Sequence, residues 1–343
     1  MKPPFSITNK MLNLIVEITQ KVTRLELEQE RNLHLRKENR IRSIQSSLAI
    51  EKNSLSVEQV TDIINGKRVF GAPKEIREVQ NAYEAYELVF KMNPYSIDDF
   101  LKAHGLMTKE LVKESGQFRG KDVGVYDSDG TLVHLGARPQ FVYHLMKELF
   151  DWAKQDDIPD LIKSCVVHFE IEMTHPFPDG NGRMGRLWQN LILSKWQRVF
   201  EWIPIETIVY EHQAKYYDML MVGDKENDST QFIEFMLEVI LETILEFDNI
   251  KGQADISKIL NDKVLDKMSD KEQQFFIQIY PFLAEVGEIK NGKASEITGR
   301  ASGTVRRYLV KMTELGIFKV MGANKNRRYV LNEKIVDKIS DKS

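Results

Sequence analysis

The sequence has few of the features that mark secreted or membrane-spanning proteins. Cysteine occurs once in 343 residues, at Cys165, which excludes an intrachain disulfide. No apolar run approaches the roughly 20 residues that a membrane-spanning helix needs, and the first residues lack the apolar core of a signal peptide. We therefore expect a soluble cytoplasmic protein without a membrane partner.

A large excess of charge of either sign is also missing. Lysine and arginine number 48, aspartate and glutamate number 51, and the net charge is -3. The composition thus implies no general attraction to nucleic acids or anionic membranes. Hydrophobic residues make up 42% and charged residues 29%, which is ordinary for a globular protein. The length predicts two or three domains.

Apolar residues recur at helical spacing through most of the chain, so we expect a mostly α-helical fold. We place an N-terminal helical region at 1–70 and a helical core at 71–250. A small C-terminal domain, preceded by a polar linking helix over 255–270, completes the chain within 251–343. His104 and His168 fall in helical stretches and are expected to pack rather than to react.

The densest group of reactive side chains is the stretch from His175 to Arg186, with the sequence HPFPDGNGRMGR. The helix before it, 161–173, is apolar on nearly all faces and therefore buried. Pro176 disfavours the α conformation at His175, so that helix ends there. A second, amphipathic helix begins near Gly182. His175 is thus expected beside a tight loop between two helices.

The loop itself favours an anion site. Gly180, Asn181 and Gly182 present free backbone N–H groups at a helix start, where the helix dipole also favours negative charge. Arg183 and Arg186 lie three residues apart on one helix face. Their planar, forked donors suit two further phosphates. The alternative is a glycine-rich corner with surface charges, but the coincidence of these polar elements favours a phosphate site.

Two more residues of the stretch suit chemistry on a phosphate. Asp179 is a hard oxygen ligand of the kind that Mg²⁺ prefers when it bridges phosphates. His175 has an ordinary pKa near neutrality and can accept a proton from an attacking hydroxyl group.

These residues resemble the signature of Fic-domain enzymes, H-x-F-x-[D/E]-G-N-G-R-x-x-R, at every defined position. The resemblance implies a Fic-type helical core with a β-hairpin flap. It also implies transfer of AMP from ATP to a protein Ser, Thr or Tyr hydroxyl, with release of pyrophosphate. By this resemblance His175 is the general base, Asp179 holds Mg²⁺, and the 180–182 loop forms the anion hole. Arg183 and Arg186 would hold the β- and γ-phosphates.

The same resemblance bears on the type of reaction. The related Doc kinases carry a lysine where this chain has Gly182. Glycine favours nucleotidyl transfer over phosphoryl transfer.

A second, shorter motif lies near the N-terminus, on a helix around 43–53. Ser47 and Glu51 stand four residues apart, which alone indicates no more than an exposed serine and glutamate. The segment resembles the inhibitory motif of many Fic proteins, [S/T]-x-x-x-E-[G/N], but has Lys52 where glycine or asparagine is usual, and Asn53 one position late. The resemblance implies that Glu51 pairs with Arg186 and allows ATP to bind only unproductively. It also implies self-modification when this helix loosens, and leaves removal of AMP open.

A β-hairpin is expected over 122–134, with strands at 122–126 and 131–134. Asp129-Gly130 between them is a strong hairpin signal. It is either a surface ornament or, by the Fic resemblance, the flap on which the protein substrate docks by strand addition.

The sequence specifies the binding of the nucleotide's adenine base less clearly. Tyr216 and Tyr217 are adjacent in a helical stretch, which is as typical of core residues as of ligand contacts. The resemblance implies that Tyr217 lines the adenine pocket. Asp224 stands where many relatives have asparagine, so a Fic transferase that uses another nucleotide donor remains an alternative.

The C-terminal segment resembles a winged helix. From Lys290 to Arg328 there are 10 lysines and arginines and 2 acidic residues, a local balance of +8. Phosphate contacts and groove insertion would allow DNA binding. The alternative is a module for protein docking or dimerisation, so a homo-oligomer stays open. A different function also stays open, a DNA-binding transcriptional regulator that uses the Fic core as a nucleotide sensor.

Overall fold

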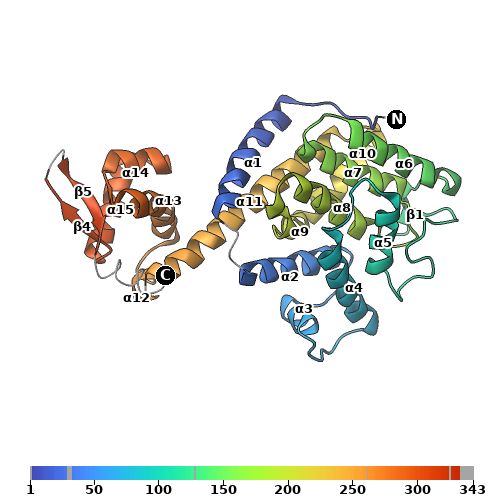
Figure 1. Cartoon of the computed structure of the whole chain (residues 1–343), viewed down its shortest axis with the longest axis horizontal. Coiled ribbons are helices and arrows are strands. Elements are labelled where there is room, and N and C mark those ends of the chain that lie inside the picture. The colour runs from blue at the N-terminus through green and yellow to red at the C-terminus, as the bar shows by residue number, and fades with distance from the viewer. Residues whose placement is uncertain (1, 29–32, 127–128, 261, 324–325, 333–343) are drawn as a thin grey trace. The chain divides into compact units, whose positions relative to one another are not determined.

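The computed structural model describes residues 2–28, 33–126, 129–260, 262–323 and 326–332. The chain divides into two compact units, residues 1–245 and 246–343. Helices predominate among the described residues of both (Figure 1), so the expected mostly α-helical fold is confirmed. None of the described helices combines the length and apolarity that crossing a membrane requires.

Unit 1 begins with helices whose ends follow local capping rules. The Thr8 hydroxyl accepts a hydrogen bond of 3.1 Å from the N–H of Met11 in the first turn of the first helix. Ser56 and Gln59 form a reciprocal capping box at the start of the third helix. The helices are α1 (Asn9–Glu28), α2 (Leu33–Ile50), α3 (Val57–Ile64), α4 (Pro73–Val89) and α5 (Ile97–Met107).

Two buried helices, α7 (Asp160–Thr174) and α8 (Asn181–Trp196), form the centre of unit 1 and pack against each other. Both carry buried residues on nearly every face, as the all-round apolar pattern predicts. The ring of Phe100 in α5 packs against Phe177 in the loop between α7 and α8 and against Trp188 of α8. These contacts fix the position of that loop. The surrounding helices are α6 (Pro139–Gln155), η1 (Arg198–Glu201), α9 (Ile205–Glu211), α10 (Gln213–Glu226) and α11 (Thr230–Ile259), which continues into unit 2.

The expected hairpin is present, although its strands are shifted by one or two residues from the predicted positions. Strands β1 (Gly124–Tyr126) and β2 (Leu132–Leu135) pair antiparallel, with an irregularity in register between Val125 and Tyr126. Gly130 takes the left-handed conformation that the turn requires. In the part of the chain that the structure describes, this sheet consists of these two strands alone.

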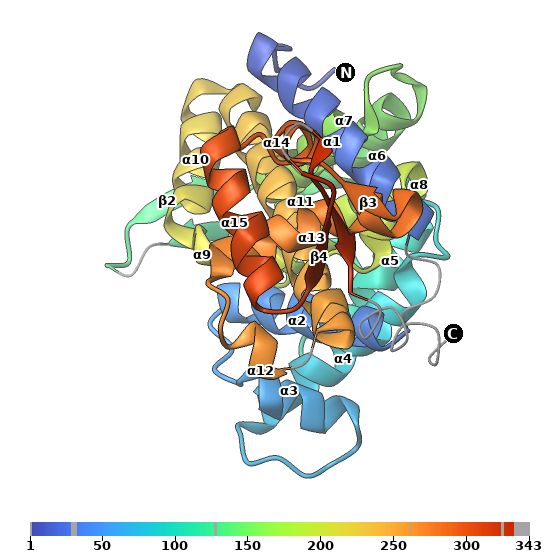
Figure 2. The ribbon, with the colours of Figure 1, turned by 90° about the vertical axis from the view of Figure 1, so that its left-hand side faces the viewer.

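The described part of unit 2 that follows Met268 combines the helices α13, α14 and α15 with a three-stranded antiparallel sheet of order β3-β5-β4. Figure 2 shows α15 lying beside β4. The sheet and the helices share an apolar core that includes Phe275, Phe276 and Leu309. The elements are α13 (Asp270–Val286), β3 (Glu288–Ile289), α14 (Asn291–Thr298), α15 (Ser302–Glu314), β4 (Phe318–Met321) and β5 (Arg328–Leu331).

The expectation of one linking helix over 255–270 is wrong. Helix α11 extends to Ile259, and a short helix α12 (Asp262–Leu265) follows it. The physical reason is burial, because Leu260 and Met268 insert their side chains into the core of unit 2 instead of facing solvent.

Candidate functional site

His175 follows directly after α7 in a left-handed conformation, with φ 49° and ψ 59°. The sequence predicted only that proline would take this residue out of the right-handed α region. A residue with a side chain pays about 1–2 kcal/mol for this conformation, so the surrounding contacts must hold it. Arg119 does so, because its Nε donates a hydrogen bond of 2.6 Å to the His175 carbonyl oxygen.

The imidazole of His175 is set up as a neutral base. Burial lowers its pKa below the ordinary value of 6.5, and the charges of His134 and Arg119 act in the same direction, against Glu172. Nδ1 lies 3.2 Å from the carbonyl oxygen of Glu172. A carbonyl can only accept, so Nδ1 carries the proton of the neutral ring. The Nε2 lone pair is then free to accept a proton.

The loop before α8 is shaped by its own side chains. Gly180 caps the helix with φ 85°, a conformation that suits glycine. Asn181 pins the loop, because its amide exchanges two hydrogen bonds of 2.8 Å with the backbone of Phe177. A Cβ atom on Gly182 would lie 2.4 Å from Glu51 Oε1, so a larger residue there would displace the Glu51 carboxylate from its present position.

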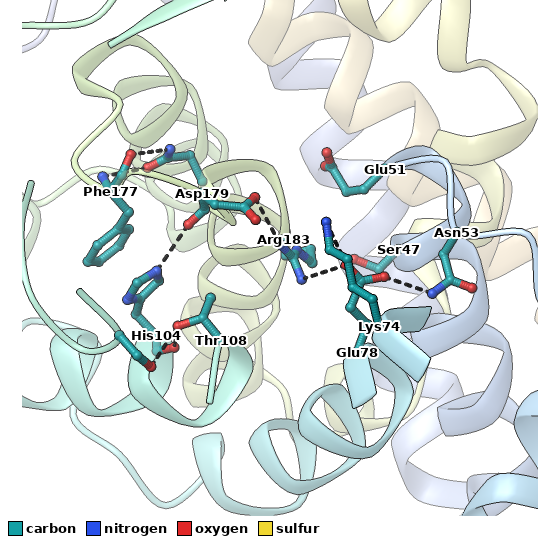
Figure 3. A network of polar contacts seen from close by, with 12 residues as sticks. Ser47, Glu51, Asn53, Lys74, Glu78, His104, Thr108, Phe177, Asp179 and Arg183 are labelled. Atoms are coloured by element: carbon teal, nitrogen blue, oxygen red, sulfur yellow. Dashed lines mark hydrogen bonds and ion pairs between the residues drawn. The ribbon is translucent and has the colours of Figure 1, made fainter. Parts of the chain in front are cut away.

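Arg183 points its guanidinium toward the acidic residues around the loop. Its Nη2 donates a hydrogen bond of 3.0 Å to Asp179 Oδ1, and Figure 3 shows its side chain between Asp179 and Glu78. The side chain is only 4% exposed, yet Nε and Nη1 have no hydrogen-bond partner within the described residues. Buried donors without partners are costly. Arg183 therefore has two buried donors, Nε and Nη1, whose hydrogen-bonding capacity is not used by the described residues.

The backbone of Asp179 is held in place by a histidine side chain. His104 stacks on Phe177 with ring centroids 3.7 Å apart, and its Nε2 contacts the Asp179 carbonyl oxygen at 3.0 Å. Its Nδ1 accepts from the N–H of Gly116 at 3.0 Å. Burial lowers the pKa of His104 to about 4, so the ring is neutral, as both bonds require. His104 is a packing residue, as the sequence suggested.

Arg186 meets the two residues of the N-terminal motif. Its Nη2 donates to Glu51 Oε1 at 2.7 Å and to the Ser47 carbonyl oxygen at 3.0 Å, while Nε donates to Ser47 Oγ at 3.1 Å. Burial lowers the pKa of Arg186, but Glu51, Tyr216 and Glu172 together outweigh this and raise the pKa above the ordinary value. The structure thus brings together three residues that the sequence singled out far apart in the chain.

The departure from the motif at Lys52 has a structural consequence. Helix α2 ends with hydrogen bonds of 2.9 Å from Lys52 N to the Ala49 carbonyl and 3.1 Å from Asn53 N to the Leu48 carbonyl. Lys52 has φ 68°, the left-handed conformation that favours glycine. A lysine therefore occupies the position where a motif glycine would be free of strain.

The two adjacent tyrosines have different environments. Tyr216 is buried, and its hydroxyl lies 3.0 Å from His168 Nε2 and 3.2 Å from Glu172 Oε1. Tyr217 is 41% exposed, with its hydroxyl 3.4 Å from the Ile50 carbonyl oxygen, next to Glu51 in the chain. Tyr217 is the one that remains accessible to a ligand.

The β1–β2 hairpin is tied to the core through His134 of β2. Its Nδ1 lies 2.8 Å from Asp224 Oδ2 of α10, and its Nε2 lies 2.8 Å from the Met173 carbonyl oxygen in the last turn of α7. The His134 and His175 ring centroids are 6.4 Å apart. Asp224 therefore anchors the hairpin in this structure.

A Fic family protein from Desulfovibrio desulfuricans G20, known from its crystal structure, is similar to this chain over nearly the whole length of both. The two are 34% identical in sequence, the match covers 97% of this chain and 98% of that one, and the TM-score is 0.70. The chain belongs to the Fic family. The Fic/DOC family model matches residues 94–193 of this Fic chain, the part that contains α7, most of α8 and the loop between them.

Relatives of this Fic chain are named adenylyltransferases. Protein adenylyltransferase fic-1 of Caenorhabditis elegans is 28% identical over 203 residues, and protein adenylyltransferase Fic of Aedes aegypti is 29% identical over 220. The matches cover 55% and 61% of this chain but 37% and 42% of those relatives, so the chain spans less than half of their length. A solved structure of Fic-1 from C. elegans shares the fold, with a TM-score of 0.59 at 22% identity.

Two residues of this Fic site, Arg119 and Gly136, were not predicted from the sequence. Arg119 donates hydrogen bonds to the carbonyl oxygens of His175, Lys121, Thr174 and Ala137, and so clamps the backbone on both sides of the base. A Cβ on Gly136 would lie 2.9 Å from both Arg119 Nη2 and His175 Cβ, so glycine is needed there. Neither residue belongs to a local pattern, and no sequence signal marked them.

Proposed function

We propose that this Fic chain is a protein adenylyltransferase that transfers AMP from ATP to a protein hydroxyl group. The observation that carries the proposal is the placement of His175, whose Nδ1 faces a carbonyl oxygen, and of Arg183, which contacts Asp179, on the two sides of one glycine-rich loop. A base and an anion site in contact with one loop suit attack by a hydroxyl group on a phosphate.

The proposed step is a displacement at the α-phosphate. The hydroxyl oxygen of the substrate forms a bond to the α-phosphorus while the bond from that phosphorus to the bridging oxygen of the β-phosphate breaks. Pyrophosphate leaves with that oxygen, and His175 Nε2 takes the hydroxyl proton. The backbone N–H groups of the 180–182 loop and the guanidinium groups of Arg183 and Arg186 stabilise the phosphate charge.

The residues present are compatible with Mg²⁺. Across the described residues, no three His, Cys, Asp or Glu side chains gather to hold a metal by themselves. Mg²⁺ usually needs only one or two carboxylates when substrate phosphates supply the remaining ligands. The Asp179 carboxylate is 44% exposed and uses one oxygen on Arg183, so it would hold the ion. Bound there, Mg²⁺ would offset the phosphate charge.

We further propose that Ser47 and Glu51 keep the enzyme inhibited. The Glu51 carboxylate occupies Arg186, which would otherwise bind the phosphate tail, and it lies against Gly182 of the loop. Loosening of α2 would free Arg186 and allow self-modification. The same glutamate would hold a water molecule if the enzyme also removes AMP. Tyr217, with its exposed ring close to Glu51, is proposed to contact the adenine base.

The partners follow from surfaces outside the site. The open edge of the β1–β2 hairpin suits addition of a strand from the protein substrate. The order of elements in unit 2 is typical of a winged helix, and DNA binding or self-association through it stays a prediction. Several of its cations have protein partners: Lys293 bonds to Glu296, Arg300 to Gln278, Lys311 to Glu272 and Arg328 to Glu288. These pairs compete with phosphate contacts and weaken the case for DNA.

The test is AMP incorporation from labelled ATP with Mg²⁺, compared among the wild type, Glu51→Gly and the double variant Glu51→Gly with His175→Ala. Strong self-labelling by Glu51→Gly, weak labelling by the wild type and none by the double variant support the transferase and its inhibition. Competition by GTP, CTP and UTP decides the nucleotide. If all variants stay unlabelled with every nucleotide and with added cell extract, the transferase proposal is wrong.

A further inference from the structure

Two cations beyond the glycine loop converge on one carboxylate of α4. Glu78 Oε1 lies 4.0 Å from Arg183 Nη1 and 3.9 Å from Lys74 Nζ. The other oxygen, Oε2, accepts a hydrogen bond of 2.8 Å from Asn53 Nδ2. Glu78 is 13% exposed, whereas Lys74 is 68% exposed and therefore accessible to a ligand. Figure 3 shows the side chains of Lys74, Glu78 and Arg183 meeting at one place.

Glu78 does not satisfy the arginine that it faces. A separation of 4.0 Å between Nη1 and the carboxylate oxygen is an ion-pair distance but too long for a hydrogen bond, and both Nε and Nη1 of Arg183 lack a hydrogen-bond partner within the described residues. The guanidinium is nevertheless almost fully buried. An anion with several oxygen atoms, such as a polyphosphate, would supply the acceptors that one distant carboxylate cannot.

We propose that Lys74 is a further residue that binds the phosphate tail of the nucleotide, and that Glu78 holds the Lys74 ammonium group while no phosphate is bound. The inference rests on the proposed function, since it assumes that a phosphate group docks at Arg183. Glu78 Oε1 is close to both cations, so it keeps the Lys74 ammonium beside Arg183. The flexible four-carbon stem of lysine allows its ammonium group to move from the carboxylate to a phosphate oxygen.

The link through Asn53 explains why Glu78 can perform this role. Asn53 follows two residues after Glu51, and its amide holds the Glu78 carboxylate by the oxygen that faces away from the cations. The segment just after α2 thus contacts Arg186 directly through Glu51. It also contacts Glu78 of α4 through Asn53, and Glu78 in turn faces Arg183. Negative charge on Glu78 also opposes an incoming phosphate, so removal of that charge should favour nucleotide binding.

The experiment measures equilibrium binding to the full chain carrying Glu51→Gly, with AMP and the uncleavable α,β-methylene analogue of ATP as ligands. Three additional changes are compared in that background: Lys74→Gln, Glu78→Gln and Arg77→Gln. Arg77 pairs with Glu110 at 2.8 Å, away from Glu78, so its replacement removes the same charge from the same helix. Glutamine at 78 keeps an oxygen for Asn53 while removing the negative charge.

We expect Lys74→Gln to weaken binding of the triphosphate about fivefold and to leave AMP unchanged. Glu78→Gln should tighten binding of the triphosphate but not of AMP. Arg77→Gln should leave the affinity for both ligands unchanged. The difference in triphosphate affinity between Lys74→Gln and its Glu51→Gly parent should shrink at high salt.

Equal effects of Lys74→Gln and Arg77→Gln, or equal losses for AMP and the triphosphate, would overturn the role of Lys74. If AMP transfer by Glu51→Gly is intact in that case, the proposed function survives and only this inference fails. If the parent neither binds the triphosphate nor labels itself, both fail together.

Discussion

Replacement of Lys52 by glycine should strengthen inhibition. Lys52 has φ 68° at the end of α2, directly after the glutamate that pairs with Arg186. A left-handed conformation costs a residue with a side chain about 1–2 kcal/mol, and glycine escapes this cost while losing about 0.5–1 kcal/mol of backbone entropy on folding. The net gain is about 0.5–1 kcal/mol for the state in which α2 is closed by this turn.

That gain corresponds to a two- to fivefold smaller population in which the turn is open. We expect the rate of self-AMPylation of Lys52→Gly to fall by the same factor, and the midpoint of thermal unfolding of unit 1 to rise by about 2 °C. The assays are labelling from ATP and differential scanning calorimetry. Lys52→Ala is the matched control, because it removes the charge and length of lysine but keeps the Cβ that causes the strain.

The reasoning is refuted if Lys52→Ala stabilises as much as Lys52→Gly, because charge rather than conformation would then be responsible. Faster labelling by Lys52→Gly would also refute it, since a relaxed turn must hold Glu51 at least as firmly.

Three further predictions follow from the site and its helices. Since burial lowers the pKa of His175, the acidic limb of the rate profile should have its midpoint below pH 6.5, with activity lost as the base is protonated; a midpoint above 7 would contradict this. Burial raises the pKa of half-buried Glu170 from 4.5 to about 7, so its ionisation destabilises the fold increasingly from pH 4.5 to 7. Glu170→Gln should therefore raise stability by about 1–3 kcal/mol at pH 8 and little at pH 4.5, measured by urea unfolding; an equal gain at both pH values would rule out ionisation as the cause. Gly136→Ala should lower kcat about 100-fold by displacing His175, and an unchanged kcat in single-turnover labelling would show that the clamp is not needed.

The local structure of the site was determined by the sequence alone. Pro176 ends α7 and the glycines start α8, because both effects act within a few residues through backbone sterics. The position of His175 beside a glycine-rich loop therefore followed from the order of residues between His175 and Arg186. The hairpin was predictable for the same reason, since Asp129-Gly130 is a local turn signal.

Only the tertiary structure decided which distant residues meet this loop. Glu51 and Arg186 are 135 residues apart in sequence, and the resemblance to a family, rather than any local rule, suggested their pairing. Nothing in the sequence indicated that Glu78 faces Arg183, because this contact depends on how α4 packs near α8. Nor did proline alone specify a left-handed His175. That conformation depends on the carbonyl clamp by Arg119, which arrives from 56 residues away.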